Sequence, residues 1–237
     1  MKLHFDTVTP QMQRVLKRLM QIPELNHFRL VGGTALSLLL GHRLSVDLDL
    51  FTDRHTDFDN LKQVIPKHFP NALFLTRSVN GQTWSVEGIK CDFFDWKVPF
   101  SESCLEVDSI RLATIKDIAA YKLEAFSDRR SEKDFRDIAE ILKQHSFAEI
   151  LNTFRKRYPF MQTGVILPPL LEPSKVERDS TIEILNKESF EAASIIIQAA
   201  IKVHEKEIAS KAEKEKKEKE ERLLNLIKRK KERDENE

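Results

Sequence analysis

The chain has 237 residues, of which 41% are hydrophobic, and its formal net charge at pH 7 is +1. This size and composition predict one or two globular domains, and the balanced charge excludes a global field that attracts nucleic acid or membranes. The two cysteines are widely spaced, which argues against a zinc framework, and the N-terminal segment is charged, which argues against a secretion signal. No apolar run approaches the roughly 20 residues that span a bilayer, which argues against a membrane anchor. We therefore expect a cytoplasmic protein.

Apolar periodicity predicts alternating helices and strands in the first half of the chain. Helices are expected where apolar residues recur at helical spacing, over residues 10–21, 34–40 and 57–69. Strands are expected over residues 28–31, 46–51, 72–79, 83–87 and 89–96. The third and fourth of these strands would form a hairpin that turns at Asn80-Gly81.

Helices dominate the predicted second half of the chain. After a short strand over residues 110–113, we expect helices over 114–127, 132–144, 147–158 and 180–208, with a proline-rich irregular linker over 159–174. The Lys- and Glu-rich composition of the C-terminal segment is typical of either a solvated helix or a disordered tail. Strands followed by helices predict an α+β fold, with a core domain over residues 1–110, a helical domain over 111–204 and a charged tail over 205–237.

The strongest chemical signal is a glycine turn followed by a pair of aspartates. Gly32 and Gly33 lie where a strand passes into a helix, so backbone N–H groups can meet phosphate oxygens, and Thr34 adds a hydroxyl. Asp47 and Asp49 alternate with leucines on the next strand and therefore project from one face. Neighbouring carboxylates repel each other unless a cation lies between them, and Mg²⁺ prefers such oxygen ligands. We favour this nucleotide site over a structural turn beside an exposed acidic strand.

A third carboxylate is expected because two-metal phosphoryl transfer generally uses a further acidic ligand. Asp92 lies in an apolar strand, where an ionised side chain is costly unless it meets a cation. Asp95 is the rival residue, but strand alternation puts it on the opposite face. Asp92 is therefore the predicted third ligand, with a second role as general base toward the attacking hydroxyl.

A cation for the triphosphate is expected in the helical half. Lys122 lies mid-helix, and its pattern fits either a surface lysine or a side chain that points at a triphosphate. Arg130 lies in a densely charged segment that is either solvated or provides a phosphate clamp. Asp134 or Asp137 would then orient the lysine or the arginine.

The segment from Leu30 to Phe51, with its Gly-Gly-Thr-Ala turn and its His-Arg-x-Ser-x-Asp-x-Asp run, resembles the first motif of the AbiEii/AbiGii toxin nucleotidyltransferases. Residues 122–138 are similar to the lysine and aspartate motifs that lie downstream in that family, so the resemblance covers about residues 25–145. These enzymes belong to the DNA polymerase β-like nucleotidyltransferase superfamily. The resemblance therefore implies a mixed sheet flanked by helices, with a helical domain that completes the active site.

The resemblance also implies roles for individual residues. It makes Lys122 a catalytic or triphosphate-binding residue, and it indicates that His42, Arg43 and Ser45 shape the loop before the aspartate pair. A metal-ligand role for His42 is not favoured, because no second histidine stands at ligand spacing. The predicted catalytic residues are Asp47, Asp49, Asp92, Lys122, Asp134 and Asp137, of which the first three would hold two Mg²⁺ ions. The predicted nucleotide contacts are Gly32, Gly33, Thr34, Arg43, Ser45, Lys122 and Arg130.

The predicted function is Mg²⁺-dependent transfer of a nucleoside monophosphate from an NTP to an acceptor hydroxyl. The resemblance implies RNA, in particular the 3′ end of tRNA, as the acceptor, and a toxin–antitoxin or phage-defence setting with a cognate antitoxin as protein partner. Two alternatives stay open on the sequence. One is the same chemistry on a small-molecule or protein hydroxyl, and the other is a catalytically silent domain that binds a partner through its charged tail.

Overall fold

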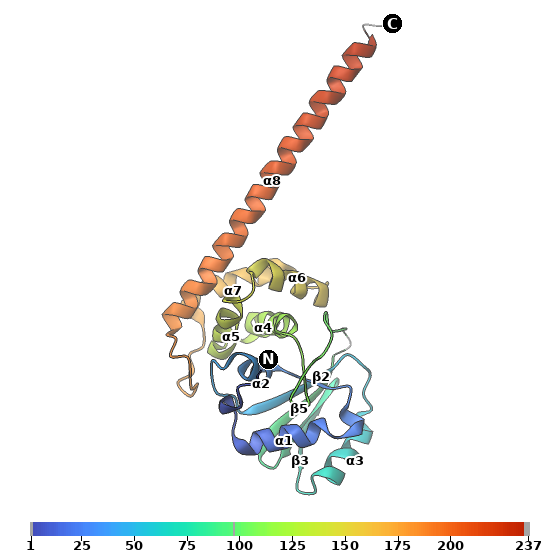
Figure 1. Cartoon of the computed structure of the whole chain (residues 1–237), viewed down its shortest axis with the longest axis vertical. Coiled ribbons are helices and arrows are strands. Elements are labelled where there is room, and N and C mark those ends of the chain that lie inside the picture. Colours follow the sequence, from blue (N-terminus) through green and yellow to red (C-terminus); the bar gives the residue numbers. More distant parts are fainter. Residues whose placement is uncertain (1, 97, 235–237) are drawn as a thin grey trace.

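The computed structural model describes residues 2–96 and 98–234 of the chain (Figure 1). Its strands are β1 (Arg29–Val31), β2 (Asp47–Thr52), β3 (Leu73–Ser78), β4 (Gly81–Val86), β5 (Ile89–Asp95), β6 (Leu105–Val107) and β7 (Ile110–Leu112). Its α-helices are α1 (Pro10–Met20), α2 (Gly32–Leu40), α3 (Phe58–His68), α4 (Ile115–Arg129), α5 (Glu132–Leu142), α6 (Phe147–Arg157), α7 (Leu167–Leu171) and α8 (Phe190–Asp234).

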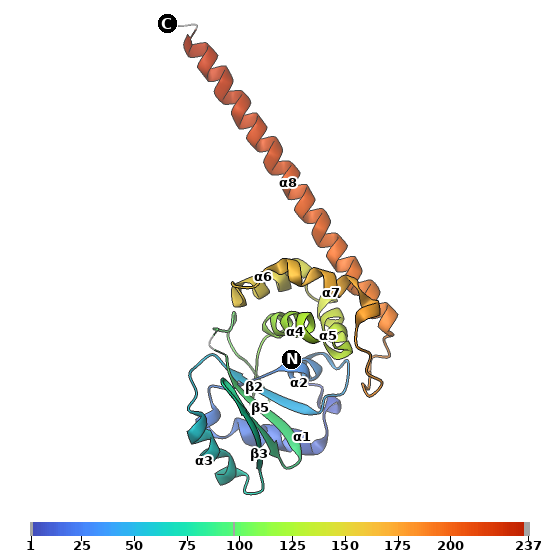
Figure 2. The same cartoon turned by 180° about the vertical axis from the view of Figure 1, so that it is seen from behind.

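All these strands join one mixed sheet in the order β3-β4-β5-β2-β1-β7-β6. The central strand β2 pairs antiparallel with β1 and parallel with β5. Helices α1 and α3 lie on one side of the sheet, while α4, α5 and α6 stand together on the other side (Figures 1 and 2). This arrangement confirms the predicted α+β class, a mixed sheet flanked by helices.

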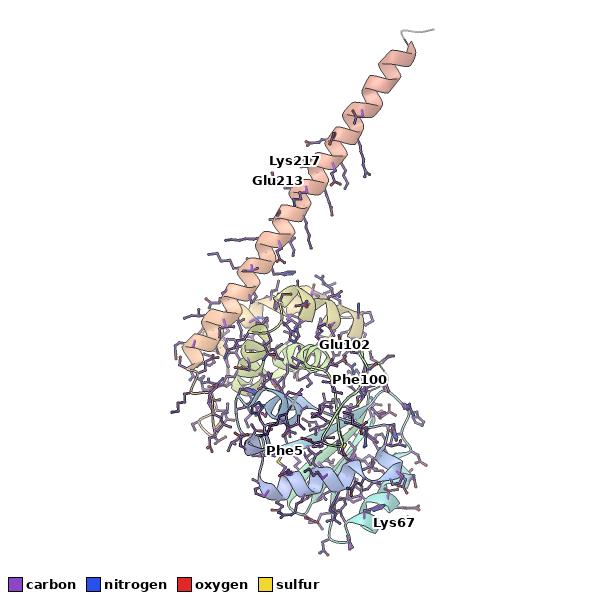
Figure 3. The ribbon with its side chains drawn as sticks, viewed as in Figure 1. Phe5, Lys67, Phe100, Glu102, Glu213 and Lys217 are labelled. Carbon is purple, nitrogen blue, oxygen red and sulfur yellow. The ribbon has the colours of Figure 1, made fainter. Side chains whose placement is uncertain are left out.

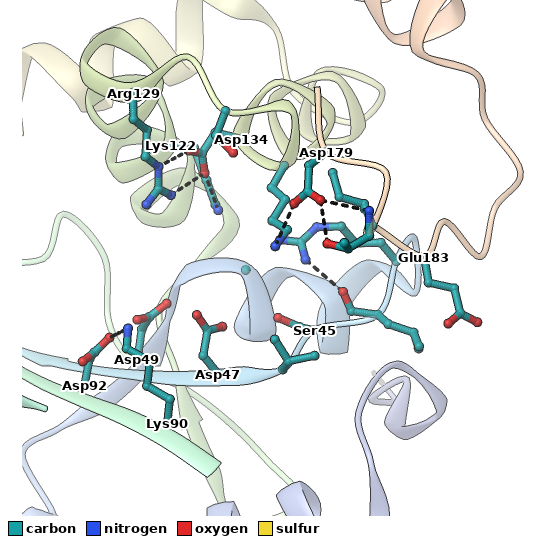
Figure 4. A pocket seen from close by; sticks show the side chains of 18 residues that line it. Ser45, Asp47, Asp49, Lys90, Asp92, Lys122, Arg129, Asp134, Asp179 and Glu183 are labelled. Atoms are coloured by element: carbon teal, nitrogen blue, oxygen red, sulfur yellow. Dashed lines mark hydrogen bonds and ion pairs between the residues drawn. The ribbon is translucent and has the colours of Figure 1, made fainter. Parts of the chain in front are cut away.

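Side-chain alternation along β2 divides its residues between the two sides of the sheet. Leu48 and Leu50 are almost fully buried in the hydrophobic core, whereas Asp47, Asp49 and Phe51 are only partly buried. The two aspartates face α4 and α5 (Figure 4), and Phe51 packs on Tyr121 of α4. The core therefore fixes the strand from behind and presents the acidic residues toward the second helical layer.

Local sequence signals start several of the helices at the expected places. The Thr9 side chain accepts a hydrogen bond from the Met12 amide, and Pro10 occupies the first turn of α1. Ser146 and Glu149 form a reciprocal capping box at the start of α6. These caps satisfy amide groups that have no partner inside the helix.

Two predictions for the C-terminal half were wrong in their boundaries. The expected helix over 180–208 begins only at Phe190, because residues before it pair with the loop that precedes β2: the Leu44 amide donates to the Glu183 carbonyl at 2.9 Å. The proline-rich segment 159–174 contains the short helix α7, and its residues Ile166 and Leu170 are buried in the core. The short strand β6 was not predicted.

Helix α8 extends far beyond the body of the protein, and its C-terminal part stands alone (Figures 1 and 2). Pairs four residues apart link its surface, such as Lys217 and Glu213 at 2.7 Å (Figure 3). The tail expected over 205–237 is thus helical through Asp234, and its last three residues lie outside the described part. The expected domain boundary at 204/205 falls inside this helix.

No helix in the described residues has the length and apolarity that a membrane crossing needs.

Candidate active site

Parallel pairing of β2 with β5 brings the three predicted metal ligands together. Asp49 stands opposite Asp92 in the strand register, and Asp47 lies two residues earlier on β2, on the same face. All three line a cavity of about 600 Å³ that also receives residues from α4, α5 and the loop over 179–183 (Figure 4). Asp95 is buried on the opposite face, where it accepts a hydrogen bond from the Thr56 amide at 2.8 Å.

The glycine turn lies in close contact with the carboxylates and with the loop before β2. Gly32 has a positive φ of 67°, and a Cβ atom there would lie 1.9 Å from a carboxylate oxygen of Asp49. A side chain at Gly33 would similarly meet the guanidinium of Arg43, at 2.3 Å. The positive φ favours glycine at position 32, and a side chain at either position would have to displace the Asp49 carboxylate or the Arg43 guanidinium. Gly33 lines the cavity.

Crowding of negative charge dominates the electrostatics of the site. Burial, followed by the charges of Asp47 and Asp92, raises the pKa of Asp49 to about 7. At Asp92, the carboxylate accepts hydrogen bonds from Thr83 at 2.5 Å and from the Lys90 ammonium at 2.6 Å. Lys90 is thus the counter-ion nearest to this part of the row.

The donor set suits a hard divalent cation, because it consists of carboxylate oxygens whose mutual repulsion a cation relieves. The carboxylates of Asp47 and Asp49 point into the cavity, and Asp92 lies beside them with its Lys90 partner (Figure 4). Within the described residues, no three His, Cys, Asp or Glu side chains already form a metal-ligand cluster. Asp92 accepts hydrogen bonds from Thr83 and Lys90, so an ion held by all three aspartates would compete with Lys90 for this carboxylate.

Lys122 is buried across the cavity from the aspartate row, so the surface interpretation of this residue was wrong. Its ammonium contacts Asp134 at 2.8 Å and Asp137 at 2.7 Å, which are the two carboxylates predicted as its partners. Burial alone would lower the pKa of Lys122, but these carboxylates raise it above its ordinary value. The lysine therefore remains positively charged inside the protein.

The loop before β2 is held by the same acidic cluster. Arg43 forms a forked pair with Asp137 at 2.7 and 2.8 Å, and His42 contacts that carboxylate at 2.7 Å. Both side chains are buried, so His42 serves to anchor the loop. Arg43 and Asp137 belong to segments 94 residues apart, and their pairing locks the loop against α5.

Three predicted nucleotide contacts, Gly32, Thr34 and Arg130, do not line the cavity. The Thr34 hydroxyl is fully buried, donates to the Asp47 carbonyl and lies 2.8 Å from the Ser45 hydroxyl, so it braces β2 and does not face the cavity. Arg130 points to Glu172 at 3.3 Å, outside the cavity, because it adopts a left-handed conformation at the end of α4. Ser45 does line the cavity.

Several lining residues were not predicted. Arg129, one position before the predicted arginine, lines the cavity and pairs with Asp134 at 2.6 Å. Lys133 also lines it and lies 3.2 Å from Asp179, in the loop that covers the Ser45 end (Figure 4). Strand alternation from Asp92 places Lys90 on the same face and would have identified it.

Comparison with known proteins agrees with this geometry. Residues 14–78, which include the glycine turn and the aspartate pair, match the family model described as nucleotidyl transferase AbiEii toxin of type IV toxin–antitoxin systems. The protein aq_aa25 of Aquifex aeolicus is 30% identical over 167 residues, which cover 68% of this chain and 81% of that protein. The chain belongs to the AbiEii nucleotidyltransferase toxin family.

Solved structures share the fold of this AbiEii-family chain, a mixed sheet flanked by helices. JHP933 from Helicobacter pylori superposes with a TM-score of 0.55 at 18% identity, over 86% of this chain and 96% of that one. The nucleotidyltransferase toxin MenT4 from Mycobacterium tuberculosis gives 0.54 at 11% identity, over 80% and 81%. The antibiotic-resistance factor ANT(2″)-Ia gives 0.51 at 16% identity, over 64% and 96%.

The raised pKa of Asp49 makes the free energy of unfolding of the metal-free protein depend on pH. The folded protein retains a proton up to about pH 7, whereas the carboxyl in the unfolded chain loses it near 3.8. The free energy of unfolding should therefore fall as the pH rises between these values. We expect the melting temperature of the wild type, relative to that of Asp49→Asn, to drop between about pH 5 and about pH 8. A difference that is constant with pH would contradict this.

Proposed function

We propose that this nucleotidyltransferase transfers a nucleoside monophosphate from an NTP to an RNA hydroxyl in a reaction that depends on Mg²⁺. The observation that carries the proposal is the in-register row of Asp47, Asp49 and Asp92, which faces the buried Lys122 across one cavity. The carboxylates suit a substrate that binds through metal ions, and the Lys122 ammonium on the other side suits a substrate that is itself negatively charged, as an NTP is.

The three aspartates would hold two Mg²⁺ ions, which polarise the α-phosphate, lower the pKa of the attacking hydroxyl and stabilise the departing pyrophosphate. The hydroxyl oxygen forms a bond to the α-phosphorus, and the bond from that phosphorus to the bridging oxygen breaks. Pyrophosphate leaves with the bonding electron pair. In this proposal Asp92 also acts as the general base, which accepts the hydroxyl proton and passes it to water.

Residues on the helical side of the cavity bind the triphosphate in this proposal. The backbone at Gly33 lies in the first turn of α2 and offers amide groups to phosphate oxygens. Lys122, Arg129 and Lys133 line the cavity and supply positive charge, with Arg129 in the role first predicted for Arg130. Asp134 and Asp137 keep Lys122 charged and fix its position.

RNA is the acceptor that we infer, with the 3′ end of tRNA as the preferred site. Support comes from membership of a toxin family, since modification of the RNA that translation requires would stop growth. The type IV description of the family also implies an antitoxin partner. We place the reaction in the cytoplasm, where NTPs and tRNA are available.

The acceptor can be identified with α-³²P-labelled NTPs, each incubated with the chain, Mg²⁺ and one acceptor pool: tRNA, total protein or small metabolites. We expect label at the 3′ end of the RNA, because the terminal hydroxyl is the nucleophile. Chelation of the metal should abolish labelling, and RNA whose 3′ end has been oxidised with periodate is the matched control. Label in protein or metabolites with none in RNA would contradict the RNA proposal and leave the nucleotidyl transfer chemistry intact.

A further inference from the structure

A second cavity, of about 370 Å³, adjoins the catalytic one along the sheet. It shares Asp49, Lys90 and Asp92 with the first cavity and continues over the exposed face of β3, β4 and β5. The row of carboxylates thus has a different environment at each end. The Ser45 end is covered by the loop over 179–183, and the other end opens into this second cavity.

Two aromatic side chains form the start of the second cavity. Phe51 stands opposite Phe94 in the strand register, one step beyond the pair of Asp49 and Asp92 on the same face. Their ring centroids lie 5.4 Å apart, and both residues are half-buried. The platform of Phe51 and Phe94 therefore follows directly after the carboxylates.

Neighbouring residues hold this platform in place. Gly81 pairs with Phe94 across β4 and β5, and a Cβ atom there would lie 2.6 Å from the Phe94 ring, so the ring can rest over the strand only beside glycine. Tyr121 packs edge-on against Phe51 with centroids 5.2 Å apart, and Trp96 lies 5.7 Å from Phe94. The rings are thus fixed before any ligand binds, which lowers the entropic cost of binding.

The chemistry of the cavity wall indicates what kind of group fits. Beyond the three shared residues, the described residues that line it are neutral: the two aromatic rings, Gly81, Gln82 and the hydroxyl side chains of Thr76, Ser78 and Thr83. The Gln82 side chain itself is buried on the other face of the sheet, where it donates to the Phe58 carbonyl at 2.7 Å. A polycationic small molecule would need further carboxylates here. A neutral planar group with hydrogen-bonding edges, such as a nucleobase, matches aromatic faces bordered by hydroxyl groups.

We propose that this cavity binds the 3′-terminal nucleotide of a single-stranded RNA acceptor, with its base stacked on the platform of Phe51 and Phe94. The terminal ribose then lies beside Asp92, at the end of the carboxylate row away from the triphosphate-binding turn. The inference rests on the proposed function and deepens it, because it gives the acceptor a place separate from that of the NTP.

The test measures binding without chemistry. A fluorescein-labelled single-stranded oligoribonucleotide ending in a 3′-deoxynucleotide is titrated with the full chain in Mg²⁺, and fluorescence anisotropy gives its affinity. Because loss of one base–aromatic stack weakens binding by roughly 5- to 150-fold, Phe94→Ala should do so, while Phe94→Tyr should bind like the wild type. Phe74→Ala is the matched control, since this half-exposed phenylalanine of β3 packs on Trp84 and does not line the cavity.

Transfer kinetics give a second readout that a merely structural effect would not reproduce. With a reactive RNA acceptor, Phe94→Ala should raise the KM for RNA and leave the KM for NTP within about twofold, since the two substrates occupy different cavities. Equal oligonucleotide affinity in Phe94→Ala and wild type would overturn the inference, and so would a raised KM for NTP alone. If the wild type labels no RNA, the acceptor proposal fails separately, and the anisotropy result still decides whether this cavity binds RNA.

Discussion

Replacement of Asp49 by Asn is expected to abolish nucleotide transfer while it raises the stability of the metal-free protein. The variant keeps the shape of the side chain but removes a negative charge that burial, Asp47 and Asp92 all disfavour. Loss of a metal ligand should lower kcat by about 10³-fold or more, because the bound ion contributes several kcal/mol to the transition state. Rates of NMP transfer and thermal melting without metal, measured on the same preparations, provide the test.

The matched control for this experiment is Asp95→Asn. Asp95 lies on β5 three residues after Asp92, but its side chain is buried on the opposite face of the sheet and does not line the cavity. We expect Asp92→Asn to lose activity and Asp95→Asn to keep the activity per folded molecule. Induced expression of the chain in bacteria should slow growth, and Asp49→Asn should relieve that effect. Full transfer activity in Asp49→Asn would refute the assignment of the metal site.

The second large effect is expected from Asp137→Asn, this time on stability. Asp137 is fully buried and contacts Arg43, His42 and Lys122, and the positive charges of Arg43 and Lys122 hold its pKa well below the usual range. Removal of one partner from a buried charge network costs on the order of 3–5 kcal/mol, because the remaining charges stay desolvated. We expect a decrease in melting temperature of roughly 10 °C for a chain of this size.

The depressed pKa also gives the sign of the pH effect. A carboxylate with a lowered pKa stabilises the fold above its unfolded pKa near 3.8, and that contribution is lost as the pH falls through the lower folded value. The penalty of Asp137→Asn should therefore be full at neutral pH and diminish in acid. Asp59→Asn serves as the contrast, since its pair with Arg77 is exposed and worth at most about 1 kcal/mol. Similar melting temperatures for both variants would show that the buried network contributes little.

The sequence predicted the acidic side of the site better than the basic side. Strand alternation placed Asp47 and Asp49 on one face and separated Asp92 from Asp95, and the structure shows these placements. The basic side depended on where a helix ends. Arg129 is the last residue of α4 and reaches the cavity, whereas Arg130 takes a left-handed conformation and turns toward Glu172. A difference of one residue at a helix end changes the direction of a side chain by a large angle, and sequence patterns do not fix helix ends that closely.

The covering loop over 179–183 illustrates a second limit. Its backbone pairs with the segment that precedes β2, and this pairing replaced the helix that apolar spacing had predicted from residue 180. Such a contact joins segments more than a hundred residues apart and leaves no local periodic signal. The same holds for the platform of Phe51 and Phe94, which exists because β2 and β5 align in one register.

The sequence by itself determined that Asp47 and Asp49 share a strand face behind a glycine turn, because strand period and glycine conformation are local properties of the chain. Only the tertiary structure decided that Asp92 stands opposite Asp49, that Lys122 is buried between Asp134 and Asp137, and that a second cavity opens beside the carboxylates. Those features depend on how distant segments pack and pair, and packing optimises the contacts of the whole fold, not those of any one segment.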